Sequence, residues 1–463
     1  MFEKKKKRIK FSILFTFLAI CGFLFASYVY LFHNPKLELL SSKTISYSGL
    51  KAQVFSRSSE IDFIEIYLSK DGAQLLKIYE YTVLDKAKDK HSISVTFDPD
   101  DEIINLIKKN KLESLYLHYS INYKNKLFSS TIKKKININI DFIPPIISDI
   151  ETDGYVYIGG IGYMLYKTSL DTYSSYVETG IDIETGKVRR FFPISIKKEN
   201  KINNLVFFSC GNMRCKDNAV LIKAEDASGN VVKYKKRIRT IINKTWNKSS
   251  INIDLNFFKN KYNEIYSTNL KSINTTHFLE LNSKLRKDNN LLIYNQTRKV
   301  TRDLLFNSFF SQMKDSKVFS RYSDFREYVE AENEKPIMSV YHWGYDLSSI
   351  KNALVYASSP GLITYVNQEG LGIYGKTIVI NHGAGFYSLY SHLSEINVEE
   401  NQKVDKTSVI AKSGETGLAF GDHLHYGTYL QGIPFDSNEM WDKKYINQKV
   451  ITIYNNFFKE DVK

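Results

Sequence analysis

The chain has 463 residues, a formal net charge of +14 at pH 7 and a hydrophobic content of 43%. This basic balance suits attraction to anionic envelope polymers or lipid headgroups, although a lysine-rich solvated surface would explain it as well. The 32 tyrosines occur beside many Lys, Asn and Ile residues, which fits a biased base composition rather than a sugar-binding platform. No sequence motif supports nucleic-acid binding, so we expect no nucleic-acid partner.

The N-terminus predicts a membrane anchor. Six positive charges within residues 4–10 precede an uncharged apolar stretch from Phe11 to Phe32. As a helix this stretch would rise roughly 33 Å, enough to cross a hydrocarbon core of about 30 Å. Positive charges favour the cytoplasmic end of a span. We therefore expect residues 1–34 to form a cytoplasmic tail and a single-pass helix in the inner (cytoplasmic) membrane, with the later domains in the periplasm.

A cleavable signal peptide is the alternative interpretation of this segment. The apolar stretch is longer than a typical signal-peptide core of roughly 7–15 residues, and no small-x-small cleavage site follows it. The tetrapeptide ending at Cys21 resembles a lipoprotein signal only superficially, because Ile20 is bulky for its position. These features favour an uncleaved anchor.

The next two segments, 35–143 and 144–242, are predicted to be tandem β-sandwich domains, the second of them immunoglobulin-like. In the first, apolar residues alternate with more polar neighbours, which is the period of half-buried strands. The alternating residues are Ile93, Val95 and Phe97, then Leu115, Leu117, Tyr119, Ile121 and Tyr123, then Ile136, Ile138 and Ile140. Pro144 and Pro145 would interrupt strand pairing and separate the two domains.

The second β segment contains a hairpin signal at residues 226–230, where Asp-Ala-Ser-Gly-Asn lies between apolar runs. It also contains Cys210 and Cys215, which in an oxidising compartment would close a small stabilising loop. The sequence does not decide whether this disulfide forms, because it does not give the distance between the two Cα atoms.

From Asp254 the apolar period becomes helical, and Asp254 is a candidate N-cap. The residues at helical spacing are Leu255, Phe258, Tyr262 and Ile265, then Phe278, Leu281 and Leu285. We predict a helical connector over residues 243–335 that continues through 304–313 and 319–328. Strand character then returns at residues 361–366 and 376–380, and residues 441–463 are expected to be a short C-terminal tail.

Histidines form three clusters after residue 340: His-Trp-Gly-Tyr-Asp at 342–346, Tyr-Ser-His-Leu at 390–393 and His-Leu-His at 423–425. Imidazole is the commonest transition-metal ligand. His342, Asp346 and His425 would leave a fourth tetrahedral position open for water, as catalytic rather than structural zinc sites do. We expect His342 and Asp346 on a strand end and turn rather than on a helix.

Two histidines remain for proton transfer. On a strand, His423 and His425 would share one face about 6.5–7 Å apart, so one ring can bind metal while the other meets substrate. A metal lowers the pKa of its water to about 7. His392 and His423 would then accept the water's proton, stabilise an oxyanion and protonate a leaving amine. The sequence does not decide which histidine does which.

The order H-x-x-x-D, Y-x-H-L, H-x-H resembles the M23 (LytM/lysostaphin-type) zinc metallopeptidases, a family of peptidoglycan endopeptidases. The resemblance covers about residues 338–436 and includes the stretches 381–385 and 414–417. It implies a compact, mostly antiparallel β domain, assigned to residues 336–440, with Zn²⁺ in its groove. By resemblance, the zinc ligands are His342, Asp346 and His425, and the catalytic pair is His392 and His423.

The chain departs from the family pattern at three places, none of them a metal ligand. Tyr426-Gly427 follows the last cluster where the family usually has an aromatic residue and a glutamate. The turn around 352–355 and the segment 399–406 lack the usual glycines. These departures concern the shape of the substrate groove. Structural, supporting or surface roles are expected for the remaining histidines, His382, His33, His91, His118 and His277.

The sequence thus predicts a mainly β multidomain protein that acts as a membrane-anchored zinc endopeptidase on peptide cross-links of peptidoglycan. A D,D-endopeptidase is expected ahead of an enzyme that cuts glycine bridges. The alternatives are a non-catalytic M23-like module that activates a separate cell-wall amidase, and an envelope scaffold. A further hypothesis is that the connector or a sandwich covers the groove until a regulatory envelope protein or the wall displaces it.

Overall fold

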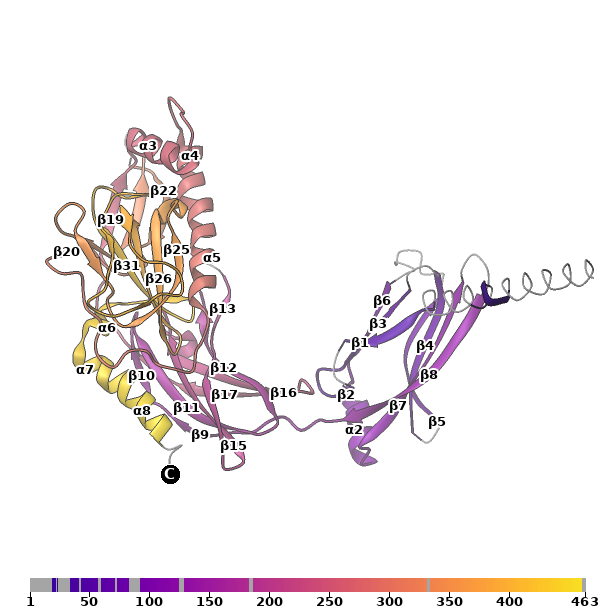
Figure 1. The fold of residues 1–463 in the computed structure, drawn as a ribbon. Helices are drawn as coiled ribbons and strands as arrows, with labels where there is room; N and C mark the ends of the chain where they lie inside the picture. Colours follow the sequence, from indigo (N-terminus) through magenta and orange to yellow (C-terminus); the bar gives the residue numbers. More distant parts are fainter. Residues whose placement is uncertain are drawn as a thin grey trace, which may run out of the picture. The chain divides into compact units, whose positions relative to one another are not determined.

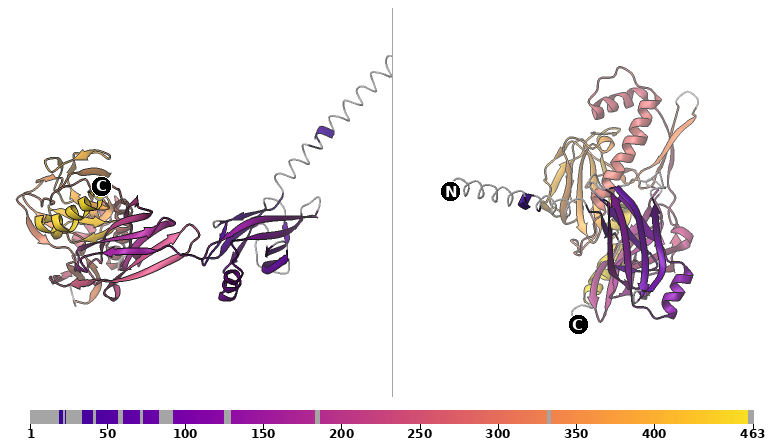
Figure 2. Two further views of the ribbon diagram at one scale, coloured as in Figure 1. Left: turned by 90° about the horizontal axis from the view of Figure 1, so that it is seen from below. Right: turned by 90° about the vertical axis from the view of Figure 1, so that its right-hand side faces the viewer.

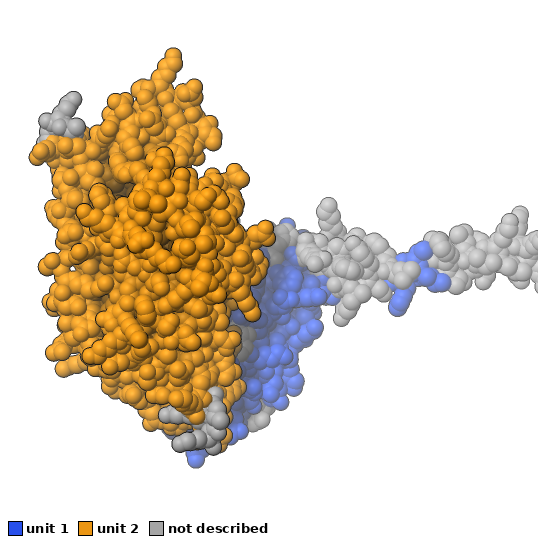
Figure 3. Space-filling model, turned by 60° about the vertical axis from the view of Figure 1, so that its left-hand side comes forward, with its two compact units in different colours: residues 1–145, 225–231 blue, residues 146–224, 232–463 orange. Residues whose placement is uncertain are grey.

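The computed structural model describes residues 19–21, 23, 34–40, 43–56, 60–70, 73–82, 92–124, 129–182, 186–330 and 334–459. The basic cluster and most of the apolar stretch expected to anchor the chain lie outside these residues. Among the described residues, no helix is both long and apolar enough to span a bilayer. The chain forms two compact units, residues 1–145 with 225–231, and residues 146–224 with 232–463 (Figure 3).

The first unit contains a five-stranded and a three-stranded sheet around one core. The five-stranded sheet, in spatial order, consists of β2 (Thr44–Ile45), β8 (Ser129–Ile140), β7 (Ser114–Lys124), β4 (Glu60–Lys70) and β5 (Ala73–Thr82). The three-stranded sheet consists of β1 (Lys36–Leu39), β3 (Leu50–Phe55) and β6 (Ser92–Phe97). The predicted alternation is confirmed in β6 and β7, because the apolar residues predicted to alternate in these strands are buried. A helix absent from our prediction, α2 (Asp101–Lys109), is capped by the Asp100 carboxylate, which accepts from the Ile103 N–H.

The β-rich part of the second unit begins with two four-stranded sheets. One consists of β14 (Ile194–Lys198), β15 (Lys201–Ser209), β11 (Ile161–Ser169) and β9 (Ile147–Glu151). The other consists of β13 (Val188–Phe191), β12 (Thr172–Ile181), β16 (Ala219–Asp226) and β17 (Val231–Arg237). A parallel pair, β10 (Tyr155–Tyr157) with β18 (Arg239–Ile241), and a short 3₁₀ helix, η1 (Lys216–Asn218), complete this part.

One local prediction for this part is confirmed, and the disulfide that the sequence did not decide is present. The hairpin at 226–230 joins β16 to β17, and the Asp226 carboxylate accepts hydrogen bonds from the backbone N–H groups of Ser228 and Asn230. Cys210 and Cys215 form a disulfide with their Cα atoms 5.0 Å apart. The loop that they close begins directly after β15.

The helical segment packs against the strands that follow it (Figures 1 and 2). It consists of α3 (Leu255–Tyr266), α4 (Thr275–Leu279), the π-helical turn η2 (Glu280–Leu285) and α5 (Arg286–Thr297). The predicted cap of α3 is confirmed, because the Asp254 carboxylate accepts from the N–H groups of Asn256 and Phe257. Phe258, Phe278 and Leu281 are buried with Val379 and Leu389 of the following domain, so the segment is part of that domain's core.

The helices expected at 304–313 and 319–328 were wrong. The first stretch contains no helix; its Phe306 and Phe310 are four residues apart but pack on one another, with ring centroids 5.0 Å apart, and Phe306 also packs on Phe386. The second stretch overlaps β20 (Lys317–Ser320) and β21 (Phe325–Val329), and β21 pairs with a strand on each side. Tertiary packing and strand pairing therefore overrode the helical spacing of these aromatic residues.

The C-terminal β domain is built on an eight-stranded antiparallel sheet (Figure 1). Its strands, in spatial order, are β20, β23 (Tyr345–Ser348), β31 (Leu424–Leu430), β27 (Phe386–Leu393), β26 (Lys376–Gly383), β25 (Gly361–Asn367) and β29 (Lys403–Val404), with β32 (Ile433–Phe435) beside β31. A second sheet contains β24 (Leu354–Tyr356), β30 (Val409–Lys412) and β28 (Glu395–Ile396), and a third contains β19 (Lys248–Asn252), β21 and β22 (Pro336–Tyr341). The 3₁₀ helix η3 (Gly372–Tyr374) precedes β26.

The residues expected to form a tail are helical and largely packed. They form α6 (Asn438–Trp441), α7 (Lys443–Ile446), the π-helical turn η4 (Asn447–Ile451) and α8 (Thr452–Lys459). Met440, Ile446 and Val450 are fully buried in one cluster with Phe207 of β15 and Phe386 of β27. These helices therefore help to join the second β segment to the C-terminal domain.

Candidate metal centre and groove

Three predicted ligands converge in the C-terminal domain. His342 follows directly on β22, while Asp346 of β23 and His425 of β31 are cross-strand partners. His342 Nε2 lies 2.9 Å from Asp346 Oδ1 and 3.0 Å from His425 Nδ1, and the last two atoms are 3.0 Å apart. All three residues are buried. The strand end expected here is confirmed, because β22 ends at Tyr341 and β23 begins at Tyr345.

This donor set fits a zinc ion. Two imidazole nitrogens and one carboxylate oxygen are ligands that zinc prefers, and three protein ligands leave a fourth position open. Their separations are close to those of donors that share one ion about 2.0–2.1 Å from each. Among the described residues, no other group of three His, Cys, Asp or Glu residues has its ligand atoms close enough together to hold one metal ion.

The predicted catalytic pair lies beside the three ligands. His423 Nε2 is 3.6 Å from Asp346 Oδ1, and the rings of His392 and His423 have centroids 4.8 Å apart. His423 immediately precedes β31, so it shares a face with His425 as period-two alternation predicts. His392, near the end of β27, has a φ of +61°, a left-handed backbone that is uncommon for a residue with a side chain. Non-glycine residues in this region often belong to functional sites.

Backbone carbonyls orient these two rings. His392 Nδ1 lies 2.9 Å from the Thr416 carbonyl, and His423 Nδ1 lies 2.9 Å from the Gly421 carbonyl. Because a carbonyl only accepts, each Nδ1 carries the proton. Each Nε2 is then left with a lone pair that can accept a proton.

Burial and neighbouring charges separate the pKa values of the two rings. Burial, reinforced by the nearby imidazoles of His423 and His425, lowers the pKa of His392 well below its usual range. Burial also acts to lower the pKa of His423, but the neighbouring Asp346 carboxylate and the Gly421 carbonyl outweigh burial and raise this pKa. At neutral pH the site therefore offers a neutral ring at His392 and a more readily protonated ring at His423.

Residues outside the predicted set hold the predicted ligands in place. An Arg326 guanidinium nitrogen donates to Asp346 Oδ2 over 2.8 Å and to the Ser320 hydroxyl over 2.8 Å. His342 Nδ1 donates to the Arg321 carbonyl over 2.9 Å. Such outer contacts fix the orientation of metal ligands. The sequence did not reveal them, because no motif spacing connects residues 320–326 with the histidine clusters.

The remaining histidines have other partners. His382 is fully buried, with Nδ1 2.7 Å from the Pro360 carbonyl and Nε2 2.7 Å from the Ser388 hydroxyl, and burial lowers its pKa to about 4. His118 lies 2.7 Å from the Ser69 hydroxyl in the first unit, and His277 belongs to the capping box of α4. His33 and His91 lie outside the described residues.

A groove of about 640 Å³ opens over the five predicted residues. Part of its wall comes from chain segments that precede residue 340. The groove residues from these segments are Asn247, Ser249, Ile251, Arg286, Phe319, Ser320, Asp324, Arg326 and Tyr328. The segment expected to be a connector thus forms part of the groove itself.

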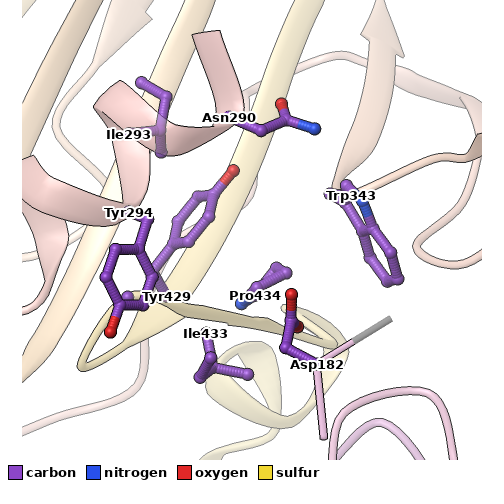
Figure 4. Close-up of a pocket in the computed structure, with 9 residues that line it drawn as sticks. Asp182, Asn290, Ile293, Tyr294, Trp343, Tyr429, Ile433 and Pro434 are labelled. Carbon is purple, nitrogen blue, oxygen red and sulfur yellow. The ribbon is translucent and has the colours of Figure 1, made fainter. Parts of the chain in front are cut away.

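A second, much smaller cavity of about 30 Å³ lies near Trp343, the neighbour of His342 (Figure 4). Asn290, Ile293 and Tyr294 of α5 lie on one side of it, and Trp343 lies on the other. Asp182, which follows β12, also contributes to its lining. At this size the cavity has room for about one water molecule, and none of the five predicted site residues lines it.

The part of the chain that contains the five predicted site residues matches a known protein family. Residues 340–437 match the family described as "Peptidase family M23". This segment belongs to family M23. The M23 segment contains all five predicted site residues.

Two relatives show the extent of the likeness. The chain is 34% identical over 96 residues to "Peptidoglycan DD-endopeptidase ShyA" of Vibrio cholerae, covering 21% of this chain and 22% of the relative. It is 36% identical over 101 residues to "DD-carboxypeptidase/endopeptidase Mpg" of Neisseria meningitidis, covering 21% of this chain and 23% of the relative. The chain thus aligns with about a fifth of the length of these curated relatives.

A solved structure was also found. The catalytic domain of the antimicrobial peptidase lysostaphin from Staphylococcus simulans is 24% identical, with a TM-score of 0.23, covering 28% of this chain and 95% of that domain.

Proposed function

We propose that this protein is a zinc endopeptidase that hydrolyses peptide cross-links of bacterial peptidoglycan. The observation that carries the proposal is the convergence of His342 Nε2, Asp346 Oδ1 and His425 Nδ1 within about one hydrogen-bond length of each other. The M23 segment and the endopeptidase names of its relatives support the reaction class. They favour a D,D-endopeptidase.

Zinc held by these three residues would supply a water molecule of lowered pKa and polarise the scissile carbonyl. The chain's own groups perform the remaining tasks. His392, neutral at pH 7, accepts a proton from the attacking water at Nε2. His423, protonated more readily, stabilises the developing oxyanion and donates a proton to the leaving amine. The groove over these rings holds the peptide and orients its scissile bond.

The site of action follows from the N-terminal sequence. We propose that residues 11–32 anchor the protein in the inner membrane and that the following domains lie in the periplasm, where peptidoglycan is within reach. The basic tail at residues 4–10 supports this orientation. An accessibility assay on cells would test it, since a cysteine probe placed after residue 34 should react with a membrane-impermeant reagent.

The experiment that tests the activity uses the protein from residue 34 onward on purified sacculi, with and without a chelator. We expect soluble muropeptides whose release stops on chelation and returns with zinc, and mass analysis of the fragments identifies the bond. No release by the zinc-loaded protein would contradict the proposal. Sacculi that are cut only when an amidase is added would support the alternative, a non-catalytic amidase activator.

A further inference from the structure

A turn at residues 320–324 encloses the metal ligand His342. On the backbone, the His342 N–H donates to the Asp324 carbonyl over 3.0 Å, and the Ser323 N–H donates to the His342 carbonyl over 2.6 Å. On the ring, Nδ1 donates to the Arg321 carbonyl over 2.9 Å. The turn therefore fixes both the backbone and the imidazole of this residue, and any displacement of the turn moves the ligand atom Nε2.

A residue of the second β segment, Asn212, holds this turn by a hydrogen bond. The side-chain amide of Asn212 donates to the Ser323 hydroxyl over 2.8 Å, and both residues are buried, with exposures of 8% and 0%. The amide oxygen of Asn212 has no hydrogen-bond partner among the described residues. The bond to Ser323 is therefore what orients this side chain.

Asn212 sits in a loop that is closed at its base. The Cys210–Cys215 disulfide joins the two ends of the loop. The Arg189 guanidinium donates to the Cys210 carbonyl over 2.6 Å, and the Gly159 N–H donates to the Gly211 carbonyl over 2.8 Å. The disulfide and these two hydrogen bonds thus fix the loop that contains Asn212 to the rest of the second β segment.

We propose that Asn212, held by the Cys210–Cys215 loop, is a positioning residue for the zinc ligand His342 and acts through Ser323. The inference rests on the proposed zinc site. It assigns a role in metal binding to a residue more than 100 positions before the M23 segment, and to the disulfide that supports it.

The physical reason is the cost of releasing the turn. Ser323 has a φ of +64°, a backbone conformation that a residue with a side chain adopts only when its surroundings enforce it. Without the Asn212 amide, a buried hydroxyl loses its donor in a place that solvent does not reach. The turn then relaxes, and His342 loses the fixed geometry that zinc requires.

The test measures zinc affinity of the full chain, purified in detergent, by competition with a chromophoric chelator. The variants are Asn212→Ala and, on the other side of the bond, Ser323→Gly, which keeps the left-handed backbone unstrained. The matched control is Asn204→Ala, because Asn204 is also a buried asparagine of this β segment and donates to the Thr168 hydroxyl instead. Absorption of the cobalt-substituted proteins reports the geometry of the ligands.

We expect Asn212→Ala and Ser323→Gly each to weaken zinc binding about tenfold, in the range known for residues behind a metal ligand. The double variant should be no weaker than either single one, since both remove the same bond. Asn204→Ala should lower thermal stability and leave zinc affinity and the cobalt spectrum unchanged. Cys210→Ala/Cys215→Ala, which opens the loop, should weaken zinc binding in the same direction as Asn212→Ala.

Unchanged zinc affinity in Ser323→Gly, or equal effects of Asn212→Ala and Asn204→Ala, would overturn the inference while leaving the zinc site intact. If the unaltered chain binds no zinc, the proposed function fails, and the inference fails with it. The two failures are therefore distinguished by the unaltered protein.

Discussion

The Nδ1 atom of His342 donates its proton to the backbone carbonyl of Arg321 over 2.9 Å. This bond fixes the tautomer, because the carbonyl only accepts, and it turns the Nε2 lone pair toward Asp346 and His425. Arg321 lies outside the M23 segment at residues 340–437. The proposed metal centre therefore depends on chain that precedes the segment to which its predicted ligands belong.

Truncation at Lys335 should damage the metal centre. A fragment that begins there loses β19, β21 and the turn at 320–324, and with them the Arg321 and Arg326 contacts to His342 and Asp346. We expect its zinc affinity to fall by about 10–100-fold relative to the full chain. Chelator competition measures this directly.

The same fragment tests whether the upstream segments restrain the enzyme. Restraint would make the fragment cleave sacculi faster than the longer protein. We expect slower cleavage, because the wall of the groove and the support of His342 are both gone. A fragment with full zinc affinity and faster cleavage would contradict our expectation and establish restraint.

Substitution of the histidines should separate metal binding from proton transfer. We expect His392→Ala and His423→Ala to retain one zinc each and to lose about 10²–10⁴-fold in kcat, the usual contribution of a general acid or base. His425→Ala should lose both zinc and activity, because it removes one of three ligands. Zinc content by atomic absorption and muropeptide release on the same samples provide the measurement. Full activity in His392→Ala would show that its assignment is wrong.

Phe386 should be a key packing residue of the second unit. Its ring contacts Phe207 of β15 and Phe306, with centroids 5.2 and 5.7 Å away. Phe386→Ala should lower the free energy of unfolding by about 3–5 kcal/mol. Because the ring joins the sandwich strands to the C-terminal sheet, we expect one cooperative transition to shift as a whole. Two calorimetric transitions of which only one moves would contradict this; Tyr173→Ala, at a residue that is 79% exposed, is the control.

Stability should depend on pH through Glu439. Its carboxyl is buried and accepts from the Ile161 N–H over 2.8 Å, and burial raises its pKa from 4.5 to about 8. The folded state thus holds an extra proton at Glu439 between these values, so the contribution of this carboxyl to stability is greatest below pH 4.5 and falls as pH rises toward 8. The loss amounts to about 5 kcal/mol at most.

Denaturant titrations at pH 5 and pH 8 measure this dependence. Glu439→Gln, which stays neutral, should remove most of the difference between the two conditions. Glu199→Gln, at an exposed position, should leave the difference unchanged. If the unaltered protein is equally stable at both pH values, the carboxyl is ionised throughout and the predicted shift does not occur.

Residue spacing predicted what depends on local sequence. Alternation gave the buried face of β7, the Asp-Ala-Ser-Gly-Asn stretch gave the hairpin after β16, and Asp254 gave the cap of α3. The histidine clusters were sufficient to predict that His342, Asp346 and His425 lie together, because metal chemistry would require one shared ion. Strand pairing then placed Asp346 opposite His425.

Tertiary contacts decided what the sequence did not reveal. Phe306 and Phe310 have the spacing of a helix, yet they pack on each other and on Phe386 without forming one. The groove wall and the turn behind His342 come from segments whose contacts lie far along the chain. Neither Asn212 nor Arg326 carries a local pattern that distinguishes it from a surface residue.

The packing of α6–α8 has a consequence for how the molecule matures. Residues 438–459 fill the cluster that contains Phe207 and Phe386, and they follow every strand that they join. A growing polypeptide emerges with its earlier domains first. The apolar residues of α6–α8 therefore pack into this cluster only after all of those strands have been made. The proposed hydrolytic centre, whose inferred support from Asn212 crosses this joint, is thus assembled late, and an incomplete nascent chain does not yet possess it.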